Sequence, residues 1–353
     1  MATLLSTLTT LGVGGPADEI VTVSDPATLV PAVEQVWAEA DDWLVIGGGS
    51  NLLIGDSGFP GTVIRVATRG IDRLPDEDSG TARLLVQAGE PWDDVVVWAL
   101  ERGLVGIESL SGIPGSAGAA PIQNIGAYGQ DLGSSLAAVH FLDYLSGAAS
   151  RIPAADLELG YRSSIFKKGL RGVVLAIELE LADPAAVGQP VQSGPVEYAQ
   201  LADSLGVGIG DRIPLPALRE AVLALRASKG MLLDGRDPDA VSAGSFFTNP
   251  IVGSAFAADL PADVPRFSVD DAGDDRAVKL SAAWLIEHSG VSRGFSLPGS
   301  RAAVSGKHTL ALVNRGGATA EQIAELARYI RARVLAEFGL LLQPEPTLVG
   351  VSL

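Results

Sequence analysis

The segment from Ser111 to Gly129, SGIPGSAGAAPIQNIGAYG, restricts the possible folds of this chain more than any other stretch. It contains too many glycine, alanine and proline residues to form a regular helix or strand. Its small side chains allow the backbone to approach another group closely. A second glycine-rich turn, GGGSN at 47–51, follows the apolar run WLVI. The fold must therefore accommodate two irregular loops, each attached to a strand.

The turn at Gly47 does not match the common nucleotide-binding signatures. A dinucleotide fingerprint, Gly-x-Gly-x-x-Gly, needs glycine at position 52, where this chain has Leu52, and the Gly-Lys-Ser/Thr ending of a P-loop is absent. Successive backbone amides of such a turn can still bind an anion, although a simple tight turn explains the motif in isolation. Taken together, the two loops could clasp a long ligand that has a pyrophosphate in its middle.

The composition excludes several classes of protein. The chain has 353 residues, 47% of them hydrophobic, which is enough for two or three domains with cores. Cysteine is absent, so disulfides, thiolate nucleophiles and iron–sulfur clusters are excluded, and with three histidines we expect no metal site. The net charge of -17 argues against general nucleic-acid binding but permits an anionic small ligand. Without a long apolar run or a signal peptide, we expect a cytoplasmic protein with no membrane insertion.

Hydrophobic periodicity and turn residues predict a chain that mixes helices and strands. Helices are expected at about 27–41, 90–103 and 217–228, from Lys279 onward, and at 319–338. Strands are expected at about 62–66, 84–88, 173–181 and 309–314, with a short one in QPEPTLVG. The last helix has a start signal, with Thr319 as N-cap and Gln322 three residues later. Residues 182–195 are the best linker candidate, and the acidic run 270–275 predicts a solvated loop.

The turn SAGSFFTNP at 242–250 places Ser245 between a glycine and two phenylalanines, where a serine gains little from packing. A nucleophilic serine needs a base, normally a histidine held by a carboxylate. The histidines available are His140, His288 and His308, and the Gly-x-Ser-x-Gly pattern of the hydrolases is absent. The residues by themselves therefore leave the role of Ser245 open.

A resemblance to the UDP-N-acetylenolpyruvoylglucosamine reductase family is carried by seven strings in the same order: VIGGGSNLL, GIPGSAGAAPIQNIGAYG, YRSSIFK, AGSFFTNP, KLSAAWLIEHSG, VSGKHTLALVN and EP near the C-terminus. It extends over about residues 10–350. It implies an α+β fold, with an FAD-binding half of the p-cresol methylhydroxylase type at 1–184, in two lobes of about 1–66 and 67–184. A smaller α+β substrate-binding domain would follow at 185–353, with the segment 340–353 returning to the active site.

The resemblance also implies a reaction, which belongs to peptidoglycan precursor synthesis. NADPH reduces FAD, and the enolpyruvyl ether of UDP-N-acetylglucosamine then receives hydride from flavin N5 and a proton, giving UDP-N-acetylmuramate. We therefore expect FAD as cofactor, NADPH as co-substrate and the enolpyruvyl nucleotide as substrate of a monomer. The FAD should be bound without a covalent link, because related oxidases usually tether it through Cys or His and the first histidine here is His140.

Three catalytic residues are implied by the resemblance. Arg162 would stabilise the enolate, and a planar guanidinium suits an anion with two oxygens, although an arbitrary arginine more often forms a surface ion pair. Ser245 would give a proton to the carbanionic carbon. Glu345 would be protonated, or would orient Arg162 or a water, although an ordinary exposed acid is the alternative.

Contacts with the ligands are implied as well. FAD would contact Gly47, Gly48, Gly49, Ser50 and Asn51 in one loop, and Gly115, Ile122, Asn124, Gly126 and Ala127 in the other. Substrate would contact Tyr198, Lys229 and Asn249. The tyrosine places the chain in the family's longer type, which carries an insertion that closes over the nucleotide sugar. Thr248 departs from the family, which often has lysine there.

Two other functions remain open at this point. Another flavoenzyme of the same fold, acting on a sugar or a hydroxy acid, would explain the glycine-rich loops but not the set of Arg162, Ser245 and Glu345. A non-enzymatic binding or regulatory module could keep the fold without the flavin. Flavin absorbance and NADPH consumption that depends on the enolpyruvyl nucleotide would separate these possibilities.

Overall fold

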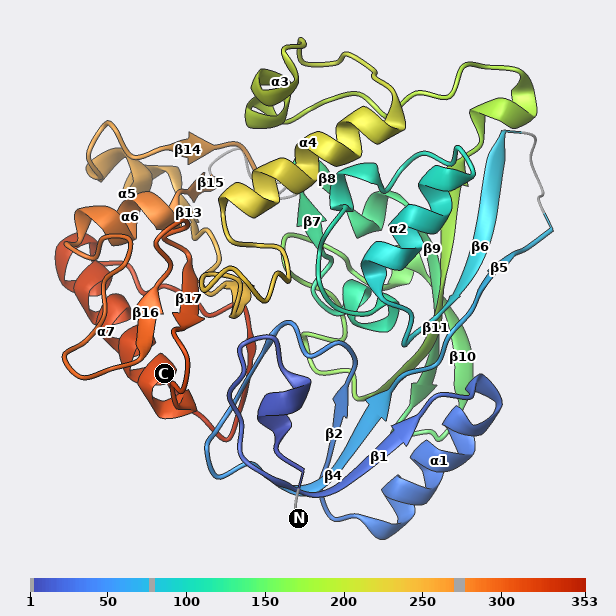
Figure 1. Cartoon of the computed structure of the whole chain (residues 1–353), viewed down its shortest axis with the longest axis horizontal. Coiled ribbons are helices and arrows are strands. Elements are labelled where there is room, and N and C mark those ends of the chain that lie inside the picture. The colour runs from blue at the N-terminus through green and yellow to red at the C-terminus, as the bar shows by residue number, and fades with distance from the viewer. Residues whose placement is uncertain (1–2, 76–79, 270–276) are drawn as a thin grey trace. The chain divides into compact units, whose positions relative to one another are not determined.

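The computed structural model describes residues 3–75, 80–269 and 277–353, so the acidic run 270–275 lies outside the described residues (Figure 1). The chain forms two compact units, which are described separately. The sheet unit comprises Asp18–Gly48 and Pro60–Ser228, and the C-terminal unit comprises Met1–Ala17, Gly49–Phe59 and Lys229–Leu353.

This division differs from the predicted domain boundary at 184/185. Residues 185–228 belong to the sheet unit, where Arg219 forms a two-pronged ion pair with Asp93 at 2.7 and 2.8 Å. The N-terminal segments belong to the C-terminal unit, because strand β3 (Leu52–Ile54) pairs in parallel with β18 (Thr347–Val349). Backbone pairing over long sequence distances, which composition does not reveal, sets the units. The FAD-binding and substrate-binding roles of the two domains stay predictions.

The sheet unit contains a three-stranded sheet in the order β1-β4-β2 and a five-stranded antiparallel sheet in the order β10-β9-β11-β6-β5. Its strands are β1 (Ala17–Val23), β2 (Trp43–Ile46), β4 (Phe59–Val66), β5 (Ile71–Arg73), β6 (Thr81–Gln87), β7 (Gly126–Ala127), β8 (Gln130–Asp131), β9 (Leu136–Asp143), β10 (Ala149–Pro153) and β11 (Gly172–Ala182). Its helices are α1 (Pro26–Glu39), α2 (Trp92–Glu101), α3 (Ala199–Leu205) and α4 (Leu215–Ser228).

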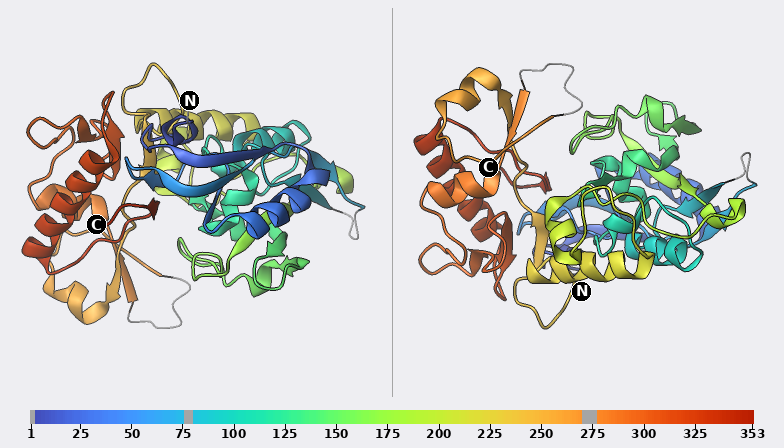
Figure 2. Two further views of the ribbon diagram at one scale, coloured as in Figure 1. Left: turned by 90° about the horizontal axis from the view of Figure 1, so that it is seen from below. Right: turned by 90° about the horizontal axis from the view of Figure 1, so that it is seen from above.

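The core of the sheet unit follows from alternation in the strands and helical spacing in the helices. Alternate residues of β6 are buried, and Leu84 and Val86 share one core with Val95 and Ala99 of α2. Helix α1, capped by the Asp25 carboxylate on the N–H of residue 27, lies along the β1-β4-β2 sheet (Figures 1 and 2). The short helical turn Ala117–Ile122 of the second glycine-rich loop contacts β11 and β6, two inner strands of the long antiparallel sheet, which therefore supports this loop.

The C-terminal unit contains two three-stranded sheets, β12-β17-β16 and β13-β15-β14, and the β18-β3 pair. Its remaining strands are β12 (Ser242–Ser245), β13 (Ile251–Gly253), β14 (Arg266–Phe267), β15 (Ala277–Leu280), β16 (Ala302–Val304) and β17 (Ala311–Asn314). Its helices are α5 (Ser254–Asp259), α6 (Ala282–His288) and α7 (Ala320–Phe338). The apolar face of α7, with Ile323, Leu326 and Ile330, is fully buried in one core with β16 and β17.

Most of the predicted elements are present, and their ends differ by a few residues. The helices expected at 27–41, 90–103, 217–228 and 319–338 are confirmed as α1, α2, α4 and α7. The Thr319 hydroxyl accepts the Gln322 N–H at 3.1 Å and the Gln322 side chain accepts the Thr319 N–H, so the predicted capping box is confirmed. Within the described residues, no helix is both long and apolar enough to cross a membrane.

The helix predicted from Lys279 was wrong at its start. Lys279 lies in strand β15, and α6 begins only at residue 282, after the Ser281 hydroxyl accepts the Trp284 N–H at 3.2 Å. The Ser281 side chain bonds a backbone N–H of the first turn and so acts as the N-cap, which ends the helix on its N-terminal side.

Candidate functional site

The two glycine-rich loops contact each other through their backbones in the sheet unit. A Cβ added at Gly48 would lie 2.7 Å from Cα of Gly115, and a Cβ added at Gly47 would lie 2.1 Å from Oγ of Ser116. Neither distance is possible for a real side chain, so only glycine allows this approach. The structure therefore brings together Gly47, Gly48 and Gly115, which the sequence had proposed as cofactor contacts.

Ser116 lies at this junction and was not singled out from the sequence. Its side chain is 5% exposed, and its hydroxyl has no hydrogen-bond partner among the described residues. A buried hydroxyl without a partner costs free energy, so such a group in a native protein calls for a ligand or an ordered water. An unpaired donor between two glycine turns fits a phosphate-bearing cofactor such as FAD. The signal was present in GIPGSAGAA, where the serine interrupts small apolar residues.

Arg162 is fixed to the second glycine-rich loop. Its Nη1 donates to the carbonyl oxygen of Asn124 at 3.2 Å, and its Nη2 donates to that of Gly126 at 3.0 Å. Arg162 has a φ of 54° and Asn124 has a φ of 46°, a region that residues with side chains seldom adopt. Such backbone strain is typical of functional sites, where the surrounding contacts maintain it. The predicted catalytic arginine and two predicted cofactor contacts thus lie together.

The same loop is ordered by its own polar contacts. Its short helical turn ends at Ile122, whose carbonyl oxygen accepts the Ser164 hydroxyl at 2.6 Å. The Asn124 amide oxygen accepts the N–H of Gly133 at 2.9 Å, and Ala127 continues into the β7-β8 hairpin. The loop is therefore held in one conformation by the protein itself, as a preorganised cofactor site requires.

Ser245 and Glu345 lie close together in the C-terminal unit. The Glu345 N–H donates to the carbonyl oxygen of Phe246 at 2.9 Å, and Phe247 forms a β-bridge with Pro344. The two phenylalanines are 0% and 1% exposed, so they anchor the turn in the core. Glu345 is buried, and its carbonyl oxygen accepts the Asn51 amide at 3.3 Å.

The structure adds one histidine to this group. Nε2 of His308 lies 3.4 Å from Oγ of Ser245. Burial lowers the pKa of His308 to about 4, and the positive charges of Lys229 and Arg293 act in the same direction. From the sequence, His308 was considered only as a possible base for a nucleophilic serine. The pairing of Ser245 with Ala311, which brings the two together, cannot be read from local sequence.

The remaining predicted residues have the following positions. Tyr198 precedes α3 in the sheet unit and is 42% exposed, with its ring 5.6 Å from that of Tyr128 in an edge-to-face contact. The Asn249 amide oxygen accepts the N–H of residue 282 at 2.9 Å, which helps to start α6. In the first glycine-rich turn, the carbonyl oxygens of Gly49 and Ser50 accept the N–H and hydroxyl of Thr10, at 3.1 and 3.4 Å.

The candidate residues are divided between the two units. The sheet unit holds Gly47, Gly48, Gly115, Ile122, Asn124, Gly126, Ala127, Arg162 and Tyr198. The C-terminal unit holds Gly49, Ser50, Asn51, Lys229, Ser245, Asn249 and Glu345.

Comparison with known proteins identifies the class first. The model of an FAD-binding domain matches residues 17–149, and the model of the C-terminal domain of UDP-N-acetylenolpyruvoylglucosamine reductase matches residues 237–349. Together with the apposed glycine-rich loops, the first match defines a flavin-binding α+β protein. The predicted α+β fold with an FAD-binding half is confirmed, whereas its p-cresol methylhydroxylase type stays a prediction.

The relatives then identify the family. Proteins named UDP-N-acetylenolpyruvoylglucosamine reductase from Leifsonia xyli and Salinispora arenicola are 53% and 46% identical, each over 99% of this chain and 98% and 95% of their own length. The crystal structure of the reductase of that name from Thermus caldophilus covers 99% of this chain and 98% of its own, with 28% identity and a TM-score of 0.65. This chain belongs to the UDP-N-acetylenolpyruvoylglucosamine reductase family.

Proposed function

We propose that this protein is a UDP-N-acetylenolpyruvoylglucosamine reductase, which uses NADPH and non-covalently bound FAD to form UDP-N-acetylmuramate. It would act as a monomer in a cytoplasmic step of peptidoglycan precursor synthesis. The observation that carries the proposal is the attachment of Arg162 to the carbonyl oxygens of Asn124 and Gly126, in a loop of the FAD-binding domain. This attachment supports a role for the arginine next to the cofactor rather than in a surface ion pair.

The glycine-rich loops would hold FAD through backbone amides and the Ser116 hydroxyl. The close contact of Gly48 with Gly115 leaves no side chain between the loops, so a diphosphate could approach the backbone directly. When bound, FAD would supply hydride transfer between the nicotinamide and the enolpyruvyl carbon. The protein's part is to hold the ring system and to exclude competing acceptors.

Arg162 would stabilise negative charge on the substrate. Addition of hydride to the enolpyruvyl carbon places charge on the two oxygens of the neighbouring carboxylate, and a guanidinium can donate to both. Because two backbone carbonyls fix the Arg162 side chain in advance, it would need little reorganisation as this charge develops.

Ser245 would give a proton to the substrate carbon next to the one that receives the hydride. A hydroxyl is a weak acid, but an enolate carbon is basic enough to take its proton. Glu345, whose backbone is paired to the residue after Ser245, would complete the catalytic set by orienting a water or Arg162. Tyr198, Lys229 and Asn249 would contact the nucleotide sugar.

The test is an anaerobic assay with the purified protein. We expect flavin absorbance in the isolated protein and NADPH oxidation that depends on added enolpyruvyl nucleotide. Oxygen-dependent turnover of a sugar or hydroxy acid instead would identify another flavoenzyme of this fold. A protein that neither contains nor takes up FAD would be a binding module, and the proposal would fail.

A further inference from the structure

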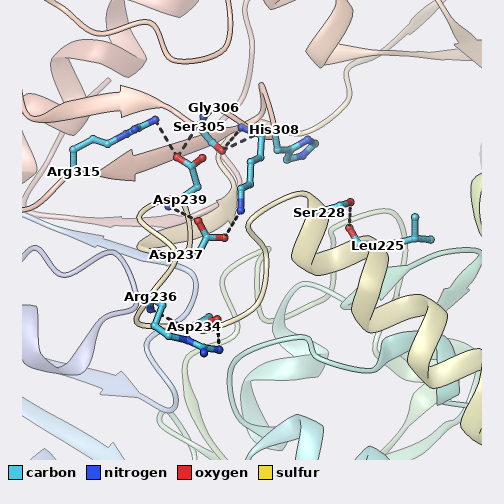
Figure 3. A network of polar contacts seen from close by, with 11 residues as sticks. Leu225, Ser228, Asp234, Arg236, Asp237, Asp239, Ser305, Gly306, His308 and Arg315 are labelled. Atoms are coloured by element: carbon cyan, nitrogen blue, oxygen red, sulfur yellow. Dashed lines mark hydrogen bonds and ion pairs between the residues drawn. The ribbon is translucent and has the colours of Figure 1, made fainter.

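The hairpin between β16 and β17 holds His308 in a fixed place. The hairpin closes when the Ser305 N–H donates to the carbonyl oxygen of Ala311 at 2.8 Å, and the Ser305 hydroxyl accepts the His308 N–H at 3.2 Å. Lys307 of this loop forms an ion pair with Asp237 at 2.8 Å, and Arg315, which follows β17, forms one with Asp239 at 3.0 Å (Figure 3). The hairpin that carries His308 is thus attached to residues 237–239 before and after His308 in the sequence.

The side chain of His308 meets Ser245 because strand β12 pairs with β17. Ser245 lies opposite Ala311 in this pairing, and His308 lies three residues before Ala311 in the turn that leads into β17. The resulting distance of 3.4 Å between Nε2 and Oγ is at the long end for a hydrogen bond. Catalytic hydrogen bonds are often long in ligand-free structures and shorten in the complex with substrate.

The surroundings of His308 keep its imidazole neutral. Burial has the largest effect, and the charges of Lys229 and Arg293 act in the same direction, so the pKa falls to about 4. Glu287 acts in the opposite direction, but its carboxylate accepts the Thr309 hydroxyl and pairs with Arg293 at 3.5 Å. A neutral imidazole has one N–H donor and one acceptor nitrogen.

We infer that His308 is the positioning residue that directs the hydroxyl proton of Ser245 toward the substrate and then replaces it. This inference deepens the proposed function and rests on it. With its proton on Nε2, His308 donates to Oγ of Ser245, so the serine's own O–H bond must point elsewhere. An imidazole that accepted from Ser245 would compete with the substrate carbon for the same proton.

The proton steps balance without another reactant. The O–H bond of Ser245 breaks as the C–H bond of the product forms, and the developing charge on Oγ is met by the Nε2–H of His308. That N–H bond breaks as a new O–H bond forms, while Nδ1 takes a proton from solvent. His308 is then neutral with its proton on Nδ1, and proton exchange with solvent restores the Nε2–H form before the next turnover. The net change is the uptake of one solvent proton per turnover.

A nucleophilic serine is not supported by the same contacts. In the serine hydrolases, a carboxylate holds the histidine so that it can accept the serine proton and become positively charged. Here Glu287 is engaged by Thr309 and Arg293, and the two nearby cations disfavour an imidazolium. The environment therefore suits a histidine that donates rather than one that accepts.

The experiment uses anaerobic stopped flow with the full-length holoenzyme. NADPH is used to reduce the flavin, and the enolpyruvyl nucleotide is then added to the reduced protein. We expect His308→Ala to slow flavin reoxidation by about 100-fold and to leave reduction by NADPH unchanged. His308→Gln, whose amide can donate to Ser245 but cannot exchange protons in this way, should fall between the wild type and His308→Ala. Added imidazole should restore reoxidation in His308→Ala but not in Ser245→Ala.

The matched control is His288→Gln. His288 lies in the same unit, where its ring stacks on Trp284 and bonds to the carbonyl oxygen of that residue at 2.9 Å. It should not change either half-reaction. If His308→Gln and His308→Ala reoxidise as fast as the wild type, or if imidazole fails to rescue a His308→Ala protein with normal FAD content, the inference is wrong. If the reduced wild type is not reoxidised by the nucleotide at all, the proposed function fails, and the inference fails with it.

Discussion

Gly48→Ala should weaken FAD binding by separating the two glycine-rich loops. The added methyl group would lie 2.7 Å from Cα and 2.9 Å from the carbonyl carbon of Gly115, and 3.3 Å from the backbone nitrogen of Ser116. Carbon atoms in contact are separated by about 3.5–4.0 Å, so one loop must move by roughly 1 Å. All three contacts are with backbone atoms, so no side-chain rotation can relieve them.

The size of the effect follows from the cost of overpacking. Forcing a methyl group into a closely packed site costs about 1–3 kcal/mol. If the loops must regain their contact to bind the cofactor, this cost corresponds to a loss of FAD affinity of roughly 5- to 150-fold. The backbone of Gly48 does not have a positive φ, so the loss would be steric and not conformational.

The assay is a titration of the apoprotein with FAD, followed by flavin fluorescence, together with thermal unfolding with and without FAD. The matched control is Gly235→Ala, because a Cβ at Gly235 meets nothing within 4 Å and its φ is not positive. The control should bind FAD like the wild type. An unchanged FAD affinity in Gly48→Ala would refute the assignment of these loops to the cofactor. A lower melting temperature with normal affinity would show that the contact serves stability alone.

Three further predictions concern two of the proposed catalytic residues and the antiparallel sheet. Ser245→Ala should leave flavin reduction by NADPH intact and slow reoxidation by substrate by about 100-fold or more, measured by stopped flow; equal losses in both half-reactions would indicate a structural role. Arg162→Lys should slow the same half-reaction, because an ammonium cannot reproduce a planar fork, and unchanged turnover would remove the arginine from the mechanism. Glu178 has its pKa lowered to about 2, chiefly by the hydrogen bond from Arg151. Its stabilising effect should be complete above the unfolded pKa of about 4.5 and disappear as the pH falls through 2. The shift sets a ceiling of about 3 kcal/mol, and because the Arg151 side chain is 41% exposed we expect Glu178→Gln to cost about 1–2 kcal/mol at neutral pH. Urea unfolding curves of the two proteins should converge toward pH 2, and parallel curves at every pH would contradict this account.

Local signals predicted local structure well. Thr319 and Gln322 gave the start of α7 because a capping box depends on residues within one turn. The error at Lys279 is also local, because the apolar pattern of KLSAAWLIEH starts before Ser281, whose side chain caps α6. Elements that depend on neighbours in sequence are thus within reach of sequence analysis, provided that the caps are read first.

Contacts between segments that lie far apart in the sequence could not be predicted from local patterns. The proximity of Glu345 to Ser245 could be expected only from the resemblance to a family, because it depends on a backbone pairing across about a hundred residues. The sequence assigns no role to His308, because nothing near it in the sequence indicates that the strand after it, β17, pairs with β12. Ser116 was missed because a buried hydroxyl is recognised only when its surroundings are known.

The C-terminal unit is built from segments that lie far apart in the sequence, and this constrains the order in which it can fold. Strand β3 pairs in parallel with β18, so Leu52 lies opposite Thr347. The N-terminal segments of this unit therefore cannot complete their pairing until β18 has been synthesised, and pairing between segments so far apart in the sequence is slow to form. A fragment limited to the matched region 237–349 would lack β3 and the segment Met1–Ala17. We expect such a fragment, without these N-terminal segments, not to form the complete unit.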